Sequence, residues 1–393
     1  MPSKIPQKFL SFFFYGAIFA ASSISQTVSA RPGSAPRAVT GNTQIVSTLP
    51  QLLKTLRDAK QATTILVSPG SYGTFIVNNL QVPPGTIVKS AKGADLATFQ
   101  GLSFDNVSGL RFQDVDIVPS SKTLIHGRYA ALVTNSRHLQ FVGVRFRAPK
   151  GGLYQKFPGG LMLRGDSNIL IQRSYFGGFK HGLMMLDASH LLIENNEFEN
   201  LQTDAIRGGG VRDSVIQANV LTDFHPKRGD HPDGIQLWSN NQKRPGRNIR
   251  ILDNLIVRGS GQPVQGIFIR DTRLTMPFEN LKIAGNLVIG ALYNGISVGG
   301  ANGAEVRENT VIPLSGQKSW IRLEQTRNAV AEKNYAGSFI FRNNKSKPVS
   351  KQNTIISANG AAFAGRISRW VRQRKAFSVY RGPVLQRLMR NTQ

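Results

Sequence analysis

The sequence predicts an all-β fold, a single-stranded right-handed parallel β-helix in which short strands wind into stacked coils. Three observations predict it. Short strands of alternating apolar and polar residues recur, an Asn follows most of them, and a second motif recurs at a fixed phase between those Asn positions. Alternation is typical of strands, and recurrence every 23 to 35 residues is typical of the coils of a solenoid.

The first repeat is a short strand that ends in Asn, as in His190–Phe198 and Asn248–Ile256. Its Asn column consists of Asn196, Asn219, Asn254, Asn286, Asn309 and Asn334, with Ser174 at the same place one coil earlier and Val144 and Val115 before it. A stacked inward Asn bonds to backbone groups and to the Asn of the neighbouring coil, and Asn tolerates the left-handed backbone of a turn. We therefore expect a buried Asn ladder.

The second repeat begins another strand of each coil with a polar, a small and an aliphatic residue. It reads His181-Gly182-Leu183, Asp204-Ala205-Ile206, Asp233-Gly234-Ile235, Gln265-Gly266-Ile267 and Asn294-Gly295-Ile296. Like positions on neighbouring parallel strands lie about 4.8 Å apart. The polar residues of this column are therefore expected to form a row along one sheet.

The flanks of the repeats predict the organisation of the chain. We expect a signal peptide at 1–30, a linker at 31–47, the β-helix domain at 48–344 and a basic C-terminal tail or cap at 345–393. Residues 48–60 have helical spacing, with Leu52, Leu53 and Leu56 on one face. A helix there would cover the open edge of the first coil.

The first thirty residues have the three parts of a secretory signal. Lys4 and Lys8 form a positive region, Phe9–Ala21 is apolar, and Val28-Ser29-Ala30 fits a cleavage site. The apolar run is short for a membrane span. We expect a secreted or periplasmic protein with no transmembrane segment after signal removal; a retained N-terminal anchor is the alternative.

The composition restricts the partners. The chain has no Cys, which excludes disulfides, thiolate metal sites and thiol nucleophiles. Its net charge is +27, and residues 345–393 hold eleven Lys and Arg with no Asp or Glu. Such a surface attracts polyanions. Because an exported protein is not expected to meet nucleic acid, we expect an acidic polysaccharide, with contact to an anionic surface through the basic tail; a basic surface that only aids solubility is the alternative.

Within the tail, residues 361–377 are predicted to form a basic amphipathic helix, with Ile367, Trp370 and Val371 on its apolar side. We expect that side to cover the last coil.

Across roughly residues 48–344 the chain resembles the pectate lyase-like superfamily of right-handed β-helices. The resemblance rests on the helix followed by the turn Ser68-Pro69-Gly70-Ser71-Tyr72, on the Asn column and on the Gly-Ile strands. Members of that superfamily are mostly lyases, hydrolases and epimerases of acidic polysaccharides, and some only bind or serve as structural coats. The resemblance therefore implies the fold, and the function has to come from the site.

The two longest coils indicate where a site lies, because insertions in a solenoid form loops on one face. The extra residues fall in 221–232, 240–247 and 272–278, around strands at 233–239 and 265–271. Candidate catalytic residues here are Asp204, Arg207, Asp230, His231, Asp233 and Arg270. Candidate substrate-binding residues are Lys227, Arg228, Gln236, Trp238, Phe268 and Asp271.

Asp204 and Asp233 share the second column, so their carboxylates are expected roughly 5 Å apart. Two carboxylates that close share a proton, bind a cation such as Ca²⁺, or are neutralised by Arg. Arg207 and Arg270 are the neighbouring cations. The alternative is a purely structural polar ladder.

Removal of the C5 proton of a uronate requires a neutralised carboxylate, a base, and an acid. Arg207, Arg270 or a cation on the aspartates could neutralise the carboxylate, His231 could be the base, and Lys227 or Arg228 could assist. Trp238 and Phe268 suit stacking on sugar rings, unless they belong to the core. The run Asp230-His231-Pro232-Asp233 is similar in composition to the Asp-Pro-His-Asp motif of mannuronan C5-epimerases, with the order of His and Pro exchanged.

The sequence thus favours an exported lyase or C5-epimerase that acts on an acidic polysaccharide. A glycoside hydrolase that uses the Asp204 and Asp233 carboxylates is the second hypothesis. A non-catalytic polysaccharide-binding or cell-surface protein is the third.

Overall fold

The computed structural model describes residues 42–91, 95–314, 316–357 and 361–374. The chain divides into two units, Met1–Thr40 and Gly41–Gln393, and all described residues belong to the second. The expected signal peptide, most of the expected linker and residues 375–393 of the basic tail lie outside the described residues.

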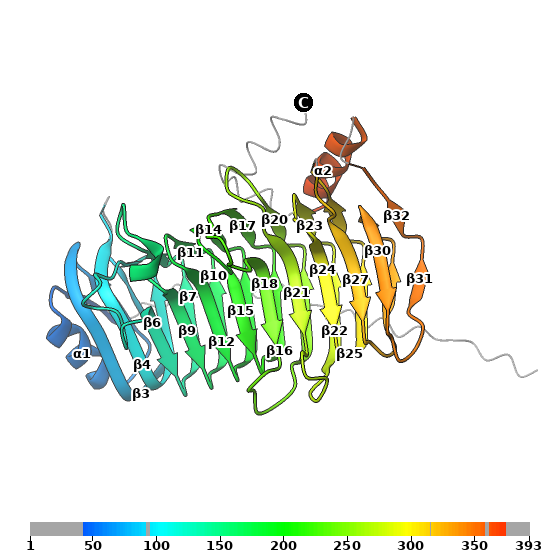
Figure 1. Ribbon diagram of the computed structural model, residues 1–393. Coiled ribbons are helices and arrows are strands. Elements are labelled where there is room, and N and C mark those ends of the chain that lie inside the picture. Colours follow the sequence, from blue (N-terminus) through cyan, green and yellow to red (C-terminus); the bar gives the residue numbers. More distant parts are fainter. Residues whose placement is uncertain (1–41, 92–94, 315, 358–360, 375–393) are drawn as a thin grey trace, which may run out of the picture. The chain divides into compact units, whose positions relative to one another are not determined.

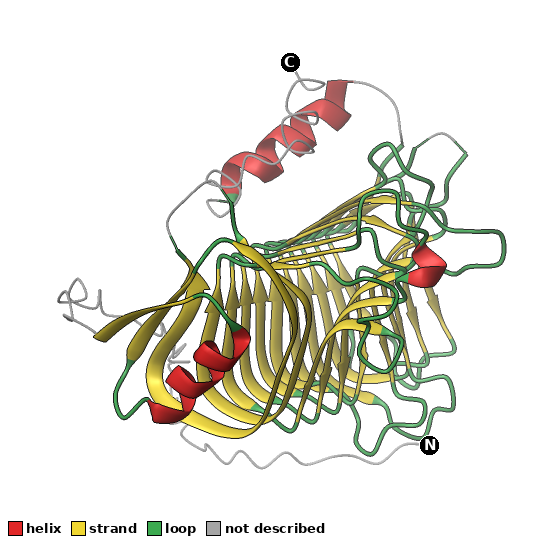
Figure 2. Cartoon of the chain, turned by 90° about the vertical axis from the view of Figure 1, so that its left-hand side faces the viewer, coloured by secondary structure: helices red, strands yellow, loops and turns green. Residues whose placement is uncertain are grey.

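The described residues form a parallel β-helix whose strands fall into three stacks, each strand pairing with its counterparts in the neighbouring coils (Figures 1 and 2). Stack A holds β1 (Asn42–Val46), β2 (Thr63–Val67), the ends of β3 (Gly70–Ser90) and β4 (Ala97–Gln113), then β7 (Arg137–Val142), β10 (Ser167–Gln172), β13 (Ser189–Glu194), β16 (Arg212–Gln217), β19 (Arg247–Leu252), β22 (Phe278–Ala284), β25 (Ala301–Arg307), β28 (Val330–Glu332) and β31 (Val349–Lys351).

Stack B follows stack A within each coil. It holds the starts of β3 and β4, then β5 (Asp116–Ile117), β8 (Arg145–Arg147), β11 (Tyr175–Gly177), β14 (Glu197–Leu201), β17 (Val220–Phe224), β20 (Leu255–Val257), β23 (Leu287–Ile289), β26 (Thr310–Ile312), β29 (Tyr335–Ala336) and β32 (Thr354–Ile355). Stack C holds the middle of β3 and β4, then β6 (Tyr129–Thr134), β9 (Gly159–Arg164), β12 (His181–Leu186), β15 (Ile206–Gly209), β18 (Asp233–Trp238), β21 (Gln265–Arg270), β24 (Asn294–Gly299), β27 (Trp320–Glu324) and β30 (Ser338–Arg342).

The predicted Asn ladder lies at the turn from stack A to stack B. The side-chain amide of Asn254 donates to the Oδ1 of Asn286 at 3.0 Å, and its own Oδ1 accepts from the amide of Asn219 at 3.0 Å. Six members from Asn196 to Asn334 are fully buried, and the ladder continues to Asn353, which the sequence analysis did not include. Ser174 takes the same place one coil earlier, as predicted.

The expected left-handed conformation belongs to a different residue of the turn. Asn195, Asp253 and Lys333 have φ of 55°, 52° and 54°, and each directly precedes a ladder Asn. The ladder Asn therefore supplies hydrogen bonds, and its neighbour makes the sharp turn. The residue before a ladder Asn, which adopts the left-handed conformation, can therefore be Asn, Asp or Lys.

The N-terminal helix α1 (Leu49–Asp58) lies at the first coils (Figure 1). Thr48 caps it by accepting from the backbone N–H of Gln51, and Leu52 and Leu56 are buried in the core of the solenoid. The strands extend beyond the expected range of 48–344: β1 precedes α1, and β31 and β32 follow residue 344. These outer strands are short or flanked by charged residues, so their periodicity is weak in the sequence.

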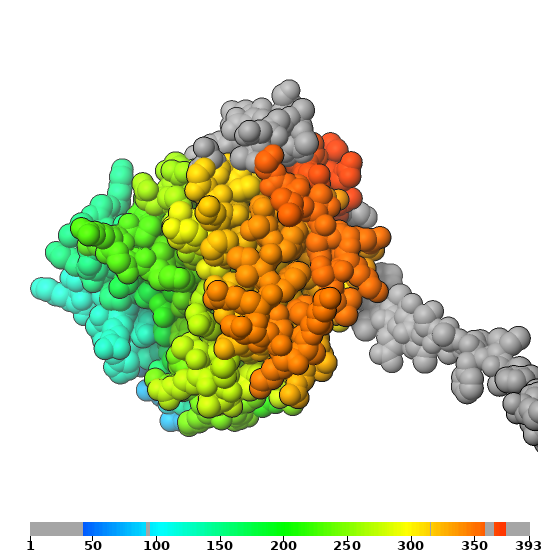
Figure 3. All heavy atoms as spheres, turned by 45° about the vertical axis from the view of Figure 1, so that its right-hand side comes forward, coloured from blue at the N-terminus to red at the C-terminus, as the bar shows by residue number. Residues whose placement is uncertain are grey.

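The C-terminal helix α2 (Ala361–Gln373) has the predicted apolar side but not the predicted position. Ile367 and Trp370 are buried against Leu255, Leu287 and Ile312, on the outer face of stack B. Figure 3 shows α2 beside the last coils, not across their end. The reason is that β20, β23 and β26 present apolar side chains outward, and α2 is the segment that covers them.

Trp370→Phe is expected to weaken this docking by about 1–2 kcal/mol, because the indole Nε1 donates to the carbonyl of Gly285 at 2.6 Å and Phe cannot donate. Hydrogen exchange should report faster exchange in α2 and unchanged exchange in stack A. Arg372→Ala, at an exposed position of the same helix, is the matched control. Equal exchange in both variants would contradict a role for this hydrogen bond.

No helix within the described residues is long and apolar enough to span a membrane.

Candidate functional site

Of the three predicted insertions, only 221–232 leads into the turn from stack B to stack C, whereas 240–247 and 272–278 lie at the turns from stack C to stack A. Residues 226–232, before β18, and 262–264, before β21, line a hollow of about 790 Å³ together with residues 292–294 and Trp320. Lys227, Arg228, Asp230 and His231 all line it. Four of the predicted site residues thus share one hollow.

His231 and Asp233 form a hydrogen-bonded pair at this hollow. The Nδ1 of His231 lies 3.1 Å from the Oδ2 of Asp233, and the Nε2 of Gln236 donates to the same oxygen at 2.6 Å. The Asp233 side chain is fully buried, whereas the His231 side chain is 55% exposed. Because an ionised carboxylate accepts only, Nδ1 carries the proton and Nε2 is left with its lone pair.

The surroundings shift the pKa of both partners. The hydrogen bond to Asp233 raises the pKa of His231 above its ordinary value. Burial raises the pKa of Asp233, against the lowering effect of the His231 hydrogen bond. The Oδ1 of Asp233 is buried and has no hydrogen-bond partner among the described residues. The pair therefore holds a proton strongly, as an acid–base group at a site does.

Asp204 occupies the position of Asp233 one coil earlier. It belongs to a second cluster of hydrogen-bonded and charged side chains. Its Oδ1 accepts from the backbone N–H of Asp233 at 3.0 Å, and its Oδ2 lies 2.9 Å from the Nη1 of Arg207. Burial raises the pKa of Asp204 to about 7, although Arg207 opposes the rise. Arg207 is thus a counterion of Asp204, which is one of the two roles considered for it in the sequence, and it is not available to neutralise a substrate carboxylate.

His181, one coil before Asp204, completes this cluster. Its ring lies 3.1 Å from the Nη1 of Arg207 and bonds to Thr203 at 2.5 Å. Burial, and then the charge of Arg207, lower the pKa of His181 to about 3, so the ring is neutral at neutral pH. The sequence pattern places His181 in the second column but does not predict its contact with Arg207, because a pattern of strands does not give the direction of the Arg207 side chain.

Asp230 anchors the loop that carries His231. Its Oδ2 accepts from the backbone N–H of Lys227 at 2.8 Å and from the side chain of Gln202 at 2.7 Å. Burial opposes ionisation, but these hydrogen bonds and the nearby Lys180 and Lys227 lower the pKa of Asp230. Asp230 therefore stays ionised and closes the turn from 227 to 230.

Several other predicted site residues make contacts with other side chains or with the backbone of the protein. Asp271 is buried, bonds to Ser239 at 2.6 Å and accepts from the backbone N–H of Met276 at 2.8 Å, so it anchors a loop and does not face a substrate. The Arg207 guanidinium lies 5.0 Å from the centroid of the Trp238 ring. The Phe268 ring meets the His231 ring edge to face at 5.3 Å, and so helps to orient the histidine.

Arg270 ends β21 with an exposed side chain, level with Trp238 of the neighbouring strand. It does not line the hollow, whereas Lys227 and Arg228 do so with exposed side chains. The cations that can meet a substrate carboxylate at His231 are therefore those of the loop.

The two aspartates do not fit a calcium site. Arg207 already occupies one oxygen of Asp204, and His231 and Gln236 occupy one oxygen of Asp233. Within the described ranges, no group of three or more His, Asp or Glu is arranged to hold a metal ion. Calcium prefers six to eight oxygen ligands, which this cluster does not offer.

Two aromatic residues in the hollow were missed by the sequence analysis. Tyr293 and Trp320 line it from the coils beyond β21. The sequence did contain a signal for them. Tyr293 directly precedes Asn294, the polar residue of the second repeat, and Trp320 pairs with Asn294 from the next coil. Neither residue fits the pattern of a polar, a small and an aliphatic residue that defines the second repeat.

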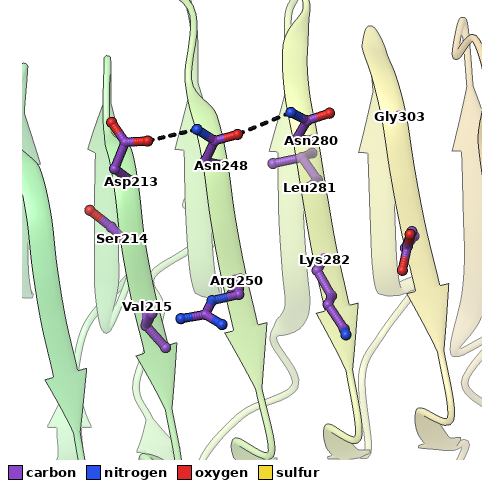
Figure 4. A pocket seen from close by; sticks show the side chains of 10 residues that line it. Asp213, Ser214, Val215, Asn248, Arg250, Asn280, Leu281, Lys282 and Gly303 are labelled. Atoms are coloured by element: carbon purple, nitrogen blue, oxygen red, sulfur yellow. Dashed lines mark hydrogen bonds between the residues drawn. The ribbon is translucent and has the colours of Figure 1, made fainter. Parts of the chain in front are cut away.

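A second hollow, of about 550 Å³, lies on the outer face of stack A, over β16, β19, β22 and β25 (Figure 4). Its rim is an outer ladder: Asn280 donates to Asn248 at 3.0 Å, and Asn248 donates to Asp213 at 2.7 Å. All three have φ near 50°, a conformation that Asn and Asp adopt more readily than most residues. No histidine is among its lining residues.

Comparison with known proteins identifies the family. Residues 87–311, more than half of the chain, match the model for the right handed beta helix region. The chain belongs to this family. The resemblance to pectate lyase-like β-helices is confirmed at the level of the fold. No curated protein matches the sequence.

Solved structures share the β-helix at low sequence identity. The catalytic unit of a GH87 alpha-1,3-glucanase from Streptomyces thermodiastaticus is 11% identical, with a TM-score of 0.50 over 84% of this chain and 72% of that one. An alginate lyase from Paenibacillus is 12% identical, with a TM-score of 0.49 over 80% and 99%. PfbA, a surface adhesin of Streptococcus pneumoniae, is 12% identical, with a TM-score of 0.46 over 79% and 87%. These likenesses describe the fold of the β-helix, and the argument for its function rests on the site.

Proposed function

We propose that this β-helix protein is an exported enzyme that removes the C5 proton of a uronate in an acidic polysaccharide, as a lyase or a C5-epimerase. The observation that carries the proposal is the His231–Asp233 pair: a buried carboxylate bonded to a half-exposed imidazole at the rim of a hollow large enough for sugar units. Asp233 fixes the tautomer and strengthens the base, and Gln236 and Phe268 hold the two side chains in place.

The charges of the hollow support an acidic substrate. A uronate C5 proton becomes removable when the neighbouring carboxylate is neutralised, because negative charge develops on that carboxylate group in the transition state. Lys227 and Arg228 are exposed on the loop that ends at His231, so a carboxylate beside the imidazole meets cations from the same loop. In this proposal His231 takes the C5 proton through Nε2. In a lyase the C4–O4 bond then breaks and the imidazolium of His231 gives that proton to the leaving O4; in an epimerase Lys227 delivers a proton to the opposite face of C5.

The geometry disfavours the two alternatives. A retaining or inverting hydrolase needs two carboxyl groups that flank the scissile bond. Asp204 and Asp233 are both buried, and each already binds protein donors. A non-catalytic polysaccharide-binding or cell-surface protein does not require an acid–base pair, and groups with shifted pKa values such as His231 and Asp233 cluster at functional sites.

We expect the protein to act on at least one member of a panel of polymannuronate, polyguluronate, polygalacturonate and polyglucuronate. Ultraviolet absorbance of unsaturated ends would identify a lyase, and a changed uronate ratio by proton NMR without chain cleavage would identify an epimerase. Reducing ends without unsaturation would instead identify a hydrolase and refute the proposed chemistry. Neutral glucans are the control, since they have no carboxylate for Lys227 and Arg228 to neutralise.

A further inference from the structure

The far end of the hollow carries a fixed aromatic pair. The ring centroids of Tyr293 and Trp320 lie 5.7 Å apart at an interplanar angle of 30°. The Nε1 of Trp320 donates to the Oδ1 of Asn294 at 2.7 Å, and the backbone N–H of Asn294 donates to the Oε1 of Gln265 at 2.6 Å. The indole is therefore held in one orientation by a buried Asn that is itself held by the preceding coil.

This pair of rings presents apolar surface that is exposed to solvent in the hollow. Tyr293 is 46% exposed and Trp320 is half-buried, although aromatic side chains of this size are usually covered. The C–H bonds on the face of a pyranose ring are apolar and carry partial positive charge, so they complement the negative face of an aromatic ring. An aromatic pair in a hollow that also presents charged and amide side chains thus fits a sugar ring better than a free anion.

The coils set the distance between this pair and the candidate base. His231 precedes β18, Tyr293 precedes β24 and Trp320 begins β27. Since β18, β21, β24 and β27 are successive neighbours in stack C, the aromatic pair lies two to three coils from His231, on the order of 10–14 Å along the axis. That span is comparable with two or three pyranose units of an extended chain.

Charges and rings are separated along the hollow. Lys227 and Arg228 belong to the loop at the His231 end, and Tyr293 and Trp320 belong to the other end. We propose that Tyr293 and Trp320 form a distal subsite that stacks on a sugar two or three units from the uronate at His231, and so makes the protein select long acidic chains that lie along the solenoid axis. This inference rests on the proposed function for the position of the reacting sugar.

The test uses Trp320→Leu and Tyr293→Leu, which keep apolar bulk without a ring, and Trp320→Phe and Tyr293→Phe, which keep a ring. Each substitution is combined with His231→Asn to prevent turnover. Isothermal titration calorimetry with di- and hexasaccharides of mannuronate, guluronate, galacturonate and glucuronate measures binding, and thermal unfolding confirms that each variant is folded. We expect the Leu variants to bind a hexasaccharide roughly five- to tenfold more weakly, the Phe variants to bind nearly as the parent does, and disaccharide binding to be unchanged.

The same variants with His231 intact should show a raised KM for the hexasaccharide at an unchanged kcat. Leu variants that bind the hexasaccharide as tightly as the parent would overturn the subsite even if the enzyme is active. A parent protein that binds none of the four hexasaccharides would overturn it as well. Ring-dependent binding in a protein that converts no polymer would support the subsite and refute the enzymatic function, so the two proposals fail separately.

Discussion

His231→Asn is expected to lower kcat/KM on the responsive polyuronate by at least about a hundredfold, because the reaction loses its general base. Asn is close to His in size and cannot accept the C5 proton. The exposed position of His231 makes unfolding an unlikely cause of the loss, and circular dichroism checks this. His190→Asn is the matched control: His190 lies on the outer face of stack A, where other coils carry Asn at the same turn.

The pH profile gives the same prediction a second readout. His231 acts as a base only when it is neutral, and Asp233 raises its pKa above 6.5. The rate should therefore rise with pH through that raised pKa. Asp233→Asn removes the ionised acceptor, so the activity that remains should rise at a lower pH than in the parent protein. The same rising limb in both proteins would show that Asp233 does not set the basicity of His231.

Asn254→Ala is expected to destabilise the fold by about 3 kcal/mol or more. The substitution orphans two buried donors, the backbone N–H and the side-chain amide of Asn219, which reach the Oδ1 of Asn254 at 3.1 and 3.0 Å. A buried donor without a partner costs about 1–3 kcal/mol. The midpoint of unfolding in guanidinium chloride, at an unchanged slope, measures the effect.

Two further variants bracket this effect. Asn254→Ser should cost less, because Ser174 already serves in this column and accepts from the backbone N–H of Val144. Asn78→Ala, at an exposed position of β3, should have little effect. If Asn254→Ala and Asn78→Ala shifted the midpoint equally, the ladder would contribute nothing beyond ordinary surface Asn residues.

The fold was predictable because each coil repeats the same physical solution. A ladder Asn recurs at one phase of the coils from Asn196 to Asn353, and the predicted row at the start of stack C appears as the pairing of Asp233 with Gln265 and of Ile235 with Ile267. The identity of the left-handed residue was not predictable from the same column, since Asn195, Asp253 and Lys333 share a conformation and little chemistry.

The site was only partly predictable, because register fixes which residues are neighbours and rotamers decide which of them interact. The sequence placed Asp204, Arg207 and Asp233 together. It left open whether Arg207 neutralises an aspartate or a substrate carboxylate; in the structure Arg207 contacts Asp204 and Trp238, and the exposed cations lie on the loop. The position of α2 was equally hidden, since its partner residues lie far back in the chain.

The docking of α2 also has a consequence in time. The contact from Arg374 to Asp253 spans 121 residues, and the contact from Trp370 to Gly285 spans 85. A ribosome adds about 5–20 residues per second, so the interval between synthesis of Asp253 and of its partner is about 6–24 seconds. During that interval Leu255, Leu287 and Ile312 form coils whose outer apolar stripe has no cover. A chaperone that binds apolar chain segments would therefore find a target in this stripe until α2 is made.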